Sequence, residues 1–556
     1  MLVGIDVGGT TTDAVLVDEG KVAKTAYVPT DHDNLPNCLL GALDELVRDV
    51  ETSKIERVVL STTLITNMIA EGKTDPVALV LIPGPGTNPK DYSLGEAHIL
   101  DGAIDFRGRE IDRLKEPQIK DAAAQISSKG FSRVAVVGKF GQRNHAHEQK
   151  VGEIMAGALP GAKIELGHKV SGQLNFPRRA ATTMLTVATK DKYKEFALGM
   201  QGALRQRQIH APVYILKADG GTLPLDKSVQ MPVETIFSGP AASIMGVLAL
   251  TPAGQTSVVM DIGGTTTDLA LILSGKPLLS SKGARVDSLL THVRAFAVKS
   301  VAIGGDSAVN VTAGCVAVGP HRNGPAICMG GPLPTPTDAM RVLGMTTIGD
   351  KALAEKAMQD VAVRLGCSSQ EAAKEVIDAV VEKIVSEVKE MFREWEQEPA
   401  YRIWEIIKKE KLQAQNVVGV GGGAPPLVPL VAARLGAKAI IPEYAPVANA
   451  IGAAVARPTL TLNLHIDTER GLYIVAEEGL MGKVADTKMT PEQAEKLARK
   501  LLAERAERLG IDEYAGDAEV AYSEVFNMIR GWSTVGRLLD VRMEIPAGLL
   551  PSWGRC

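Results

Sequence analysis

The chain has 556 residues, of which 45% are hydrophobic and 23% charged, and this length predicts several domains with ordinary hydrophobic cores. Its 61 basic and 65 acidic residues give a net charge of −4, so the chain lacks the positive field typical of nucleic-acid-binding proteins. No apolar run approaches the ~20 residues that a membrane helix requires, and the N-terminus has no basic segment typical of a secretion signal. We therefore expect a cytoplasmic protein that binds neither nucleic acid nor membrane.

A repeated motif organises the chain. Residues 4–18 read GIDVGGTTTDAVLVD and residues 260–273 read MDIGGTTTDLALIL, so an Asp, two Gly, three Thr and a second Asp recur at one spacing. In each copy an apolar run of strand length precedes the glycines and another follows the threonines, which predicts two β-hairpins. Nearly half of the chain separates the copies, which suits two homologous halves rather than a short solenoid repeat.

The two hairpin turns have the chemistry of a phosphate site. Glycines let backbone N–H groups approach an anion closely, and threonine hydroxyls add neutral donors. One such turn is weak evidence, but two turns with the same threonines and aspartates predict nucleotide binding. The expected nucleotide-binding residues of the turns are Gly8, Gly9, Thr10, Thr11, Gly263, Gly264, Thr265 and Thr266.

Two aspartates in each motif are candidates for catalysis. Asp6 and Asp261 end the first strand of their hairpins, where a carboxylate is suited to hold the waters of Mg²⁺. We expect both to be catalytic and metal-binding. Asp13 and Asp268 begin the second strands and act either as structural caps of the hairpin or as a general base. We expect a structural role for Asp13 and include Asp268 among the catalytic residues.

A third glycine cluster follows at Gly421, Gly422 and Gly423, after the strand-like run 417–420 and before a helix that Pro425 or Pro426 opens. Such a cluster alone is most simply a tight turn between a strand and a helix. After two phosphate hairpins, it also fits the base and ribose of a nucleotide, so all three glycines are expected nucleotide-binding residues. Two helices rich in small residues, 238–250 and 442–456, are expected to pack closely.

The remaining segments alternate between strands and helices. The runs 54–62 and 131–140 are typical of buried strands. Residues 176–209 read as a long helix, and residues 368–398 as an amphipathic helix with Ser368 or Ser369 as its N-cap. This alternation predicts an α/β protein with mixed sheets.

Together these motifs resemble the actin-like ATPase superfamily, which includes sugar kinases and actin, and more narrowly the HyuA-type subunit of the hydantoinase/oxoprolinase family. Besides the hairpins, the resemblance is carried by STTLITN at 61–67, ADGGT at 218–222, PVETIFSGPAAS at 232–243, PTPTDAMRVLG at 334–344 and VGVGGGAPP at 418–426. It implies two actin-like (ribonuclease H-like) halves, 1–175 and 176–458, around a nucleotide cleft, with a smaller C-terminal extension, 459–556.

The sequence departs from the family pattern at three places. Phe106 stands in IDFRGR, residues 104–109, where the family commonly has an Asp-His-Arg-Gly run. A glycine-rich stretch of the family appears as IGGDSAV at 303–309, and its Asp-Pro-Gly-Pro-Ala-Cys-Tyr region as RNGPAICMGG at 322–331. These departures leave the substrate open, whereas the nucleotide motifs are intact.

The resemblance implies an ATP- and Mg²⁺-dependent hydrolase of a cyclic amide or imide, such as a hydantoin, 5-oxoproline or a related lactam. Phosphorylation of the amide oxygen would make its carbon more electrophilic toward water. The resemblance also implies an oligomer that includes a HyuB-type partner subunit. The alternatives are one subunit of an ATP-dependent ketone carboxylase, a chaperone-like ATPase that reactivates a partner enzyme, and a small-molecule kinase.

The acceptor oxygen must lie in line with the γ-phosphate, between the two hairpins. Polar residues in loops beside that gap are therefore candidates for contact with the substrate. Threonine and asparagine in such loops are also common helix caps, so both roles stay open. The candidate substrate residues are Thr62, Thr63, Asn67 and Asp219.

Overall fold

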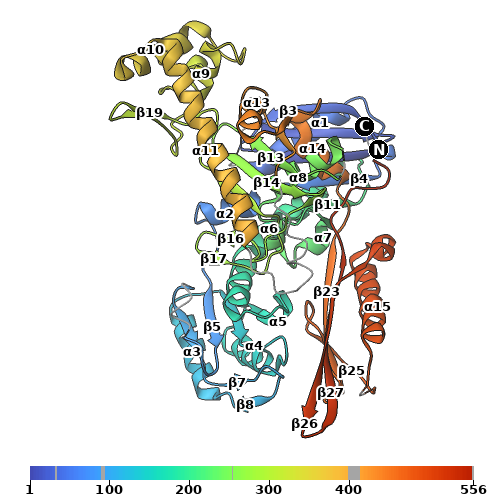
Figure 1. The fold of residues 1–556 in the computed structure, drawn as a ribbon. Helices are drawn as coiled ribbons and strands as arrows, with labels where there is room; N and C mark the ends of the chain where they lie inside the picture. Colours follow the sequence, from blue (N-terminus) through green and yellow to red (C-terminus); the bar gives the residue numbers. More distant parts are fainter. Residues whose placement is uncertain are drawn as a thin grey trace.

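The structure is a computed structural model that describes residues 1–9, 11–31, 34–88, 94–252, 254–397, 413–486 and 488–553. It confirms the expected α/β class (Figure 1). Two six-stranded sheets carry the two hairpins, and a four-stranded and a five-stranded sheet form separate parts of the molecule. None of the helices in the described ranges is long and apolar enough to span a membrane.

The first sheet consists of β1 (Leu2–Val7), β2 (Thr11–Asp18), β3 (Lys21–Pro29), β4 (Arg57–Ser61), β11 (Val213–Leu216) and β12 (Thr222–Pro224). Their order across the sheet is β12-β11-β4-β1-β2-β3. β1 pairs antiparallel with β2, as predicted for the first hairpin, and parallel with β4. Because β11 and β12 come from beyond residue 175, this sheet does not stop at the predicted boundary of the first half.

The second sheet consists of β13 (Ser257–Ile262), β14 (Thr267–Leu273), β15 (Lys276–Pro277), β18 (Val298–Val301), β21 (Asn416–Val420) and β22 (Lys438–Ile440). β13 pairs antiparallel with β14 and parallel with β21, so it repeats the arrangement around β1. The registers also agree, because Asp6 lies opposite Asp13 and Asp261 lies opposite Asp268. The sequence repeat is therefore a structural repeat.

Helices cover these sheets and join them. Those that precede β13 in the chain, apart from the helices of the lobe described below, are α1 (Leu35–Val47), α2 (Leu64–Ala70), α6 (Phe176–Gln206), α7 (Leu225–Ser228) and α8 (Ser238–Leu250). Those that follow β13, apart from α15 described below, are α9 (Pro336–Val342), α10 (Lys351–Leu365), α11 (Ser369–Gln397), α13 (Ala424–Leu435) and α14 (Ala448–Val455). This part of the chain also contains two short strand pairs. They are β16 (Arg285–Val286) with β17 (Leu289–Leu290), and β19 (Val309–Thr312) with β20 (Cys315–Val318). The long helices predicted at 176–209 and 368–398 are confirmed.

A separate lobe follows the first strands of the chain, drawn at the bottom left of Figure 1. It contains β5 (Ala78–Ile82), β6 (Ala97–Ile99), β7 (Ala103–Ile104), β8 (Glu110–Asp112), α3 (Glu116–Ser128), β9 (Arg133–Gly138), α4 (Ala146–Ala158), β10 (Lys163–Leu166) and α5 (Gly167–Val170). The C-terminal sheet contains β23 (Leu460–Asp467), β24 (Leu472–Val475), β25 (Leu480–Lys483), β26 (Glu519–Arg530) and β27 (Ser533–Ile545), with α15 (Pro491–Leu509) on one face. The division of the chain into three domains stays a prediction.

The two six-stranded sheets are joined through α8 and α14, and small residues make the contact between these helices possible. A Cβ atom on Gly246 of α8 would lie 2.1 Å from the carbonyl oxygen of Ala448. A Cβ atom on Gly452 of α14 would lie 2.2 Å from the carbonyl oxygen of Ala242. The backbones of the two helices are therefore in direct contact, as their composition predicted. α14 begins later than the predicted residue 442 because Pro446 interrupts the helical hydrogen bonds before it.

We predict that Gly246→Ala destabilises the protein by about 1–3 kcal/mol, because the added methyl group forces α8 and α14 apart. Gly239 lies on the same helix and a Cβ atom there would meet nothing within 4 Å, so Gly239→Ala is the matched control. Urea unfolding of both variants measures the difference. Equal stability of the two variants would show that the helix contact does not depend on Gly246.

Candidate active site

The two hairpins converge on one side chain, Asn449 in the first turn of α14. Its Nδ2 donates to Oδ2 of Asp6 at 3.3 Å and to Oδ2 of Asp261 at 3.2 Å. Asp6 and Asp261 come from different halves of the chain, yet they share this one amide group. The structure thus brings together the two aspartates that the sequence repeat selects.

The two hairpin turns have the same backbone geometry. The N–H of Gly8 donates to the carbonyl of Thr11 at 2.9 Å, and the N–H of Gly263 donates to the carbonyl of Thr266 at 3.0 Å. A Cβ atom on Gly9 would meet nothing within 4 Å, so the first turn is open beside this residue. Thr10 lies outside the described residues. That Thr11, Thr265 and Thr266 bind nucleotide stays a prediction.

The second turn is covered by the stretch IGGDSAV, which departs from the family pattern. Gly305 donates to the carbonyl of Gly263 at 3.0 Å, and Asp306 donates to the carbonyl of Gly264 at 2.7 Å. The carboxylate of Asp306 also pairs with Nη2 of Arg322 at 2.9 Å. This pair of charged residues beside the second hairpin was not selected from the sequence.

The third glycine cluster packs against the second hairpin. β21 ends at Val420 and α13 begins at Ala424, so the predicted strand, turn and helix are confirmed. Gly421 has a φ of +79°, and a Cβ atom there would lie 2.7 Å from Oδ1 of Asp261. Gly423 donates to the carbonyl of Ile262 at 3.1 Å. Glycine is therefore required for the turn to approach Asp261, and the structure brings Gly421–Gly423 to the acidic pair.

The carboxylates of the site are poorly neutralised. Burial, reinforced by the carboxylates of Asp13 and Asp261, raises the pKa of Asp6 to about 7 against the hydrogen bonds from Ser61 and Asn449. Burial likewise raises the pKa of Asp13 to about 6 and that of Asp268 to about 6. Oδ1 of Asp6 has no hydrogen-bond partner among the described residues. A buried carboxylate with an unused oxygen favours a proton or a cation beside it.

These residues fit a hard divalent cation that keeps most of its water. Carboxylate oxygens are the ligands that Mg²⁺ prefers, and the unused Oδ1 of Asp6 is an available one. In the part of the chain that the structure describes, no group of three His, Cys, Asp or Glu residues could hold a metal ion. Such a site suits Mg²⁺ bound by one or two carboxylates and by phosphates, rather than an all-protein cage. Asp6 and Asp261 would hold it.

Residues missed in the sequence support the acidic pair. Ser243 of α8 donates from Oγ to Oδ2 of Asp261 at 2.5 Å, and Ser61 of β4 lies opposite Asp6 in the sheet. Asn449 is the only polar residue in the run 447–455. That isolated amide in an apolar helix was the signal that could have found it.

The candidate substrate residues fall into two places. Thr62 and Thr63 directly follow Ser61, and Asn67 lies one helical turn further on. Oγ1 of Thr62 accepts from the N–H of Leu64, and Nδ2 of Asn67 donates to Oγ1 of Thr63 at 3.3 Å. These bonds lie at the start of α2. Asp219 instead accepts hydrogen bonds from Gly221 and Thr459 and lines a cavity that contains no residue of the turns. The structure does not bring Asp219 together with the other three.

The site therefore lies between two matched hairpin sheets of an α/β fold, joined by a pair of helices that carries the residue linking their aspartates. The chain belongs to the hydantoinase/oxoprolinase family. The sequence profile described as hydantoinase/oxoprolinase matches residues 179–461, and the profile of the hydantoinase/oxoprolinase N-terminal region matches residues 2–158. The resemblance seen in the motifs is confirmed.

Three relatives show the range of this similarity. The alpha subunit of caprolactamase from Pseudomonas jessenii is 25% identical over 80% of this chain and 68% of that protein. The gamma subunit of acetophenone carboxylase from Aromatoleum aromaticum is 26% identical over 70% of this chain and 60% of that protein. An uncharacterized protein of Methanocaldococcus jannaschii is 26% identical over 67% of this chain and 62% of that protein. The chain thus spans between 60% and 68% of the length of these relatives.

Two solved structures share the fold. A nucleotide-free acetone carboxylase matches with a TM-score of 0.72 and 17% identity, over 99% of this chain and 87% of that chain. The ATP-dependent caprolactamase of Pseudomonas jessenii matches with a TM-score of 0.72 and 20% identity, over 98% of this chain and 87% of that chain. The whole described arrangement, including the C-terminal sheet, is therefore a fold that known ATP-dependent enzymes use.

We predict that the metal-free and nucleotide-free protein loses stability as pH rises from about 4 to 7. In this window the folded chain still binds the proton of Asp6, whose pKa is about 7, while the unfolded chain has released it. The free energy of unfolding therefore falls with rising pH, for Asp6 by an amount on the order of a few kcal/mol.

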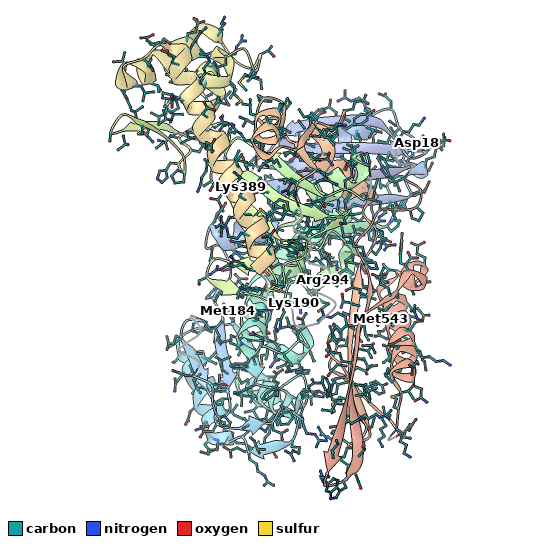
Figure 2. The ribbon with its side chains drawn as sticks, in the orientation of Figure 1. Asp18, Met184, Lys190, Arg294, Lys389 and Met543 are labelled. Atoms are coloured by element: carbon teal, nitrogen blue, oxygen red, sulfur yellow. The ribbon has the colours of Figure 1, made fainter. Side chains whose placement is uncertain are left out.

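Asp6→Asn removes this contribution, so the melting temperature should fall less between pH 5 and pH 8 in the variant than in the wild type. Asp18 lies at the exposed outer end of β2, labelled in Figure 2, and Asp18→Asn should keep the wild-type slope. Melting curves in a chelator measure all three proteins. A wild-type slope in Asp6→Asn would contradict the prediction.

Proposed function

We propose that this protein is an ATP-dependent enzyme that opens a cyclic amide or imide by phosphorylating its carbonyl oxygen. The observation that carries the proposal is the pair formed by the buried Asp6 and the half-buried Asp261, held by one amide between two glycine-threonine hairpins. Membership in the hydantoinase/oxoprolinase family and the similarity to one caprolactamase chain support a lactam, a hydantoin or 5-oxoproline as substrate.

ATP drives this reaction because hydrolysis of an unstrained lactam is unfavourable. The amide oxygen attacks the γ-phosphorus, ADP leaves, and the amide carbon becomes strongly electrophilic. Water then adds to that carbon, the C–N bond breaks, the nitrogen takes up a proton, and a second water releases phosphate from the acyl phosphate that remains. In total, one lactam, one ATP and two waters give one amino acid, ADP and phosphate.

The residues of this chain have positioning roles in that sequence. The N–H groups and hydroxyls of the two turns would hold the phosphates, and Gly421–Gly423 would lie against the nucleoside. Asp6 and Asp261 would hold Mg²⁺, which when bound supplies positive charge to the transferring phosphoryl group. Asn449 and Ser243 fix the orientation of Asp261, and Asn449 also binds Asp6. Asp268, with its raised pKa, is the proposed general base.

A second candidate is one subunit of an ATP-dependent ketone carboxylase. The gamma subunit of acetophenone carboxylase is as similar to this chain in sequence as the caprolactamase chain is, and the two solved structures match equally well. Both relatives are named as subunits, so we also propose a partner subunit of the HyuB type within a larger oligomer.

The test is ATP turnover by the purified chain with Mg²⁺, alone and with 5-oxoproline, hydantoin, caprolactam or acetophenone, and with and without a co-expressed partner subunit. We expect stimulation by a cyclic amide.

Asp261→Ala should lower turnover at least about a hundredfold, because phosphoryl transfer depends on positioning and charge neutralisation. Asp18→Asn should leave it unchanged. Stimulation by the ketone alone would favour the carboxylase, and stimulation by a protein alone the chaperone-like ATPase.

We further predict that Asn67→Ala raises the Michaelis constant for the organic substrate or lowers its turnover. Asn67 lies one helical turn after Thr63, beside the end of β4 that neighbours Asp6. Nucleotide affinity should change little, because the proposed nucleoside contact at Gly421–Gly423 is on the other sheet. Titration with a fluorescent ATP analogue supplies the comparison. Equal losses of substrate and nucleotide affinity would assign Asn67 to the structure of the loop instead.

A further inference from the structure

A large cavity lies away from the acidic pair. Its volume is about 660 Å³, within the range of small-molecule sites, and its wall includes Ser257, Ile272 and the C-terminal segment 545–551. Ser257 begins β13, whereas the hairpin turn follows Ile262 at the other end of the same strand. A strand advances about 3.3 Å per residue, so the cavity begins roughly 16 Å from the turn. The cavity is therefore a different place from the proposed phosphate site.

Three separate parts of the chain enclose this cavity. They are the second sheet with the end of α8, the loop around Arg294, and the C-terminal sheet with the segment that follows it. Figure 2 shows Arg294 between the body of the molecule and the C-terminal sheet, on which Met543 is labelled. Trp553 fixes the last segment by donating from Nε1 to the carbonyl of Ala249 at 3.1 Å. Ligand sites occur preferentially at such junctions.

The cavity has charged groups with unused hydrogen-bonding capacity. Arg294 donates from Nη1 to Oγ1 of Thr461 at 3.1 Å and to Oε2 of Glu544. Among the described residues, these bonds use only Nη1 of Arg294 and Oε2 of Glu544, which leaves Nε and Nη2 of Arg294 and Oε1 of Glu544 for a ligand. The side edge of a guanidinium formed by Nε and Nη2 matches a carboxylate, and a free carboxylate oxygen matches an ammonium group.

The charges and the walls narrow the class of ligand. Asp219 and Glu544 are compensated by Lys217 and Arg294. The charges of Lys276 and Glu519, which also line the cavity, offset each other, so the wall is close to neutral and suits a ligand without net charge. Apolar side chains complete the lining, among them Leu248, Phe296 and Leu549. A ligand that bonds both Arg294 and Glu544 and contacts the apolar wall therefore carries one carboxylate, one ammonium group and an apolar chain.

We propose that this cavity binds a small zwitterionic amino carboxylate, with its carboxylate on the free edge of Arg294 and its ammonium group on Glu544. Ring opening of a cyclic amide yields a product of this class, and the assignment of the ligand as that product rests on the proposed function. The proposal that an amino carboxylate binds in the cavity does not depend on the proposed function. α8 and β13 line the cavity at one end and hold Asp261 at the other, through Ser243 and directly, so an occupied cavity contacts the elements that position the acidic pair.

The test is isothermal titration of the nucleotide-free chain with 6-aminohexanoate, hexanoate and hexylamine. We expect 6-aminohexanoate to bind at least tenfold more tightly than either single-charge analogue. Arg294→Lys keeps a positive charge beside Glu544 but loses the planar edge, and should weaken binding at least tenfold. Arg542→Lys is the matched control, because Arg542 lies on β27, the strand of Glu544, outside the cavity, and donates to Asn463.

Leu248→Trp fills the cavity and should abolish the binding of 6-aminohexanoate. If Arg294→Lys fails to fold, this second variant tests whether the ligand binds in the cavity. MgATP affinity should be unchanged in both variants. The proposal would be overturned if 6-aminohexanoate did not bind, if hexanoate bound equally well, or if ATP competed with 6-aminohexanoate. It would also be overturned if Arg294→Lys or Leu248→Trp folded normally and bound 6-aminohexanoate with wild-type affinity. Because none of these measurements involves turnover, their failure is distinct from a failure of the proposed function.

Discussion

The contact between α8 and α14 is the constraint on which the site depends. These helices touch backbone to backbone because Gly246 and Gly452 lack side chains, and a Cβ atom on Gly4 of β1 would lie 2.1 Å from the carbonyl oxygen of Ala450. α14 is thereby fixed against both the first sheet and α8. Only in that position can the short side chain of Asn449 reach Asp6 and Asp261 together. The geometry of the acidic pair is thus set by packing of glycines at some distance from it.

The hairpins and their aspartates were predictable because their determinants are local. Each strand is an apolar run next to a glycine turn, and duplication of the motif doubled the signal. The third glycine turn and helices α6, α8 and α11 have similar local signals in their prolines, caps and apolar periodicity. What a single sequence could not reveal is which distant segments meet. The sheet containing β11 and β12 crosses the predicted boundary at residue 175 because β11 pairs with β4, and β12 pairs in turn with β11.

The site residues also fall into those with recognisable local motifs and those whose role depends on contacts between distant segments. Asp6, Asp261 and Gly421 carried recognisable motifs, and the structure brings them together. Asn449 is a single amide in an apolar helix, and its role appears only when two halves of the chain are assembled around it. Asp219 belongs to a motif of the family, yet its loop faces Thr459 and Arg294 at the C-terminal sheet. A motif can select a residue as a candidate for the site, but only the fold shows which residues it contacts.

The neighbours of each residue also explain how residues 104–109 depart from the family pattern. Phe106 is 63% exposed, whereas the adjacent Arg107 pairs with Asp467 at 2.8 Å and with Glu469 at 2.7 Å. These ion pairs join the lobe to the C-terminal sheet, and Asp467 is almost fully buried. Removing one partner of a buried pair is costly, whereas changing an exposed aromatic residue is not. The retained arginine is therefore explained by the joining of two parts of the molecule, while the exposed position beside it makes no such contact and is free to differ.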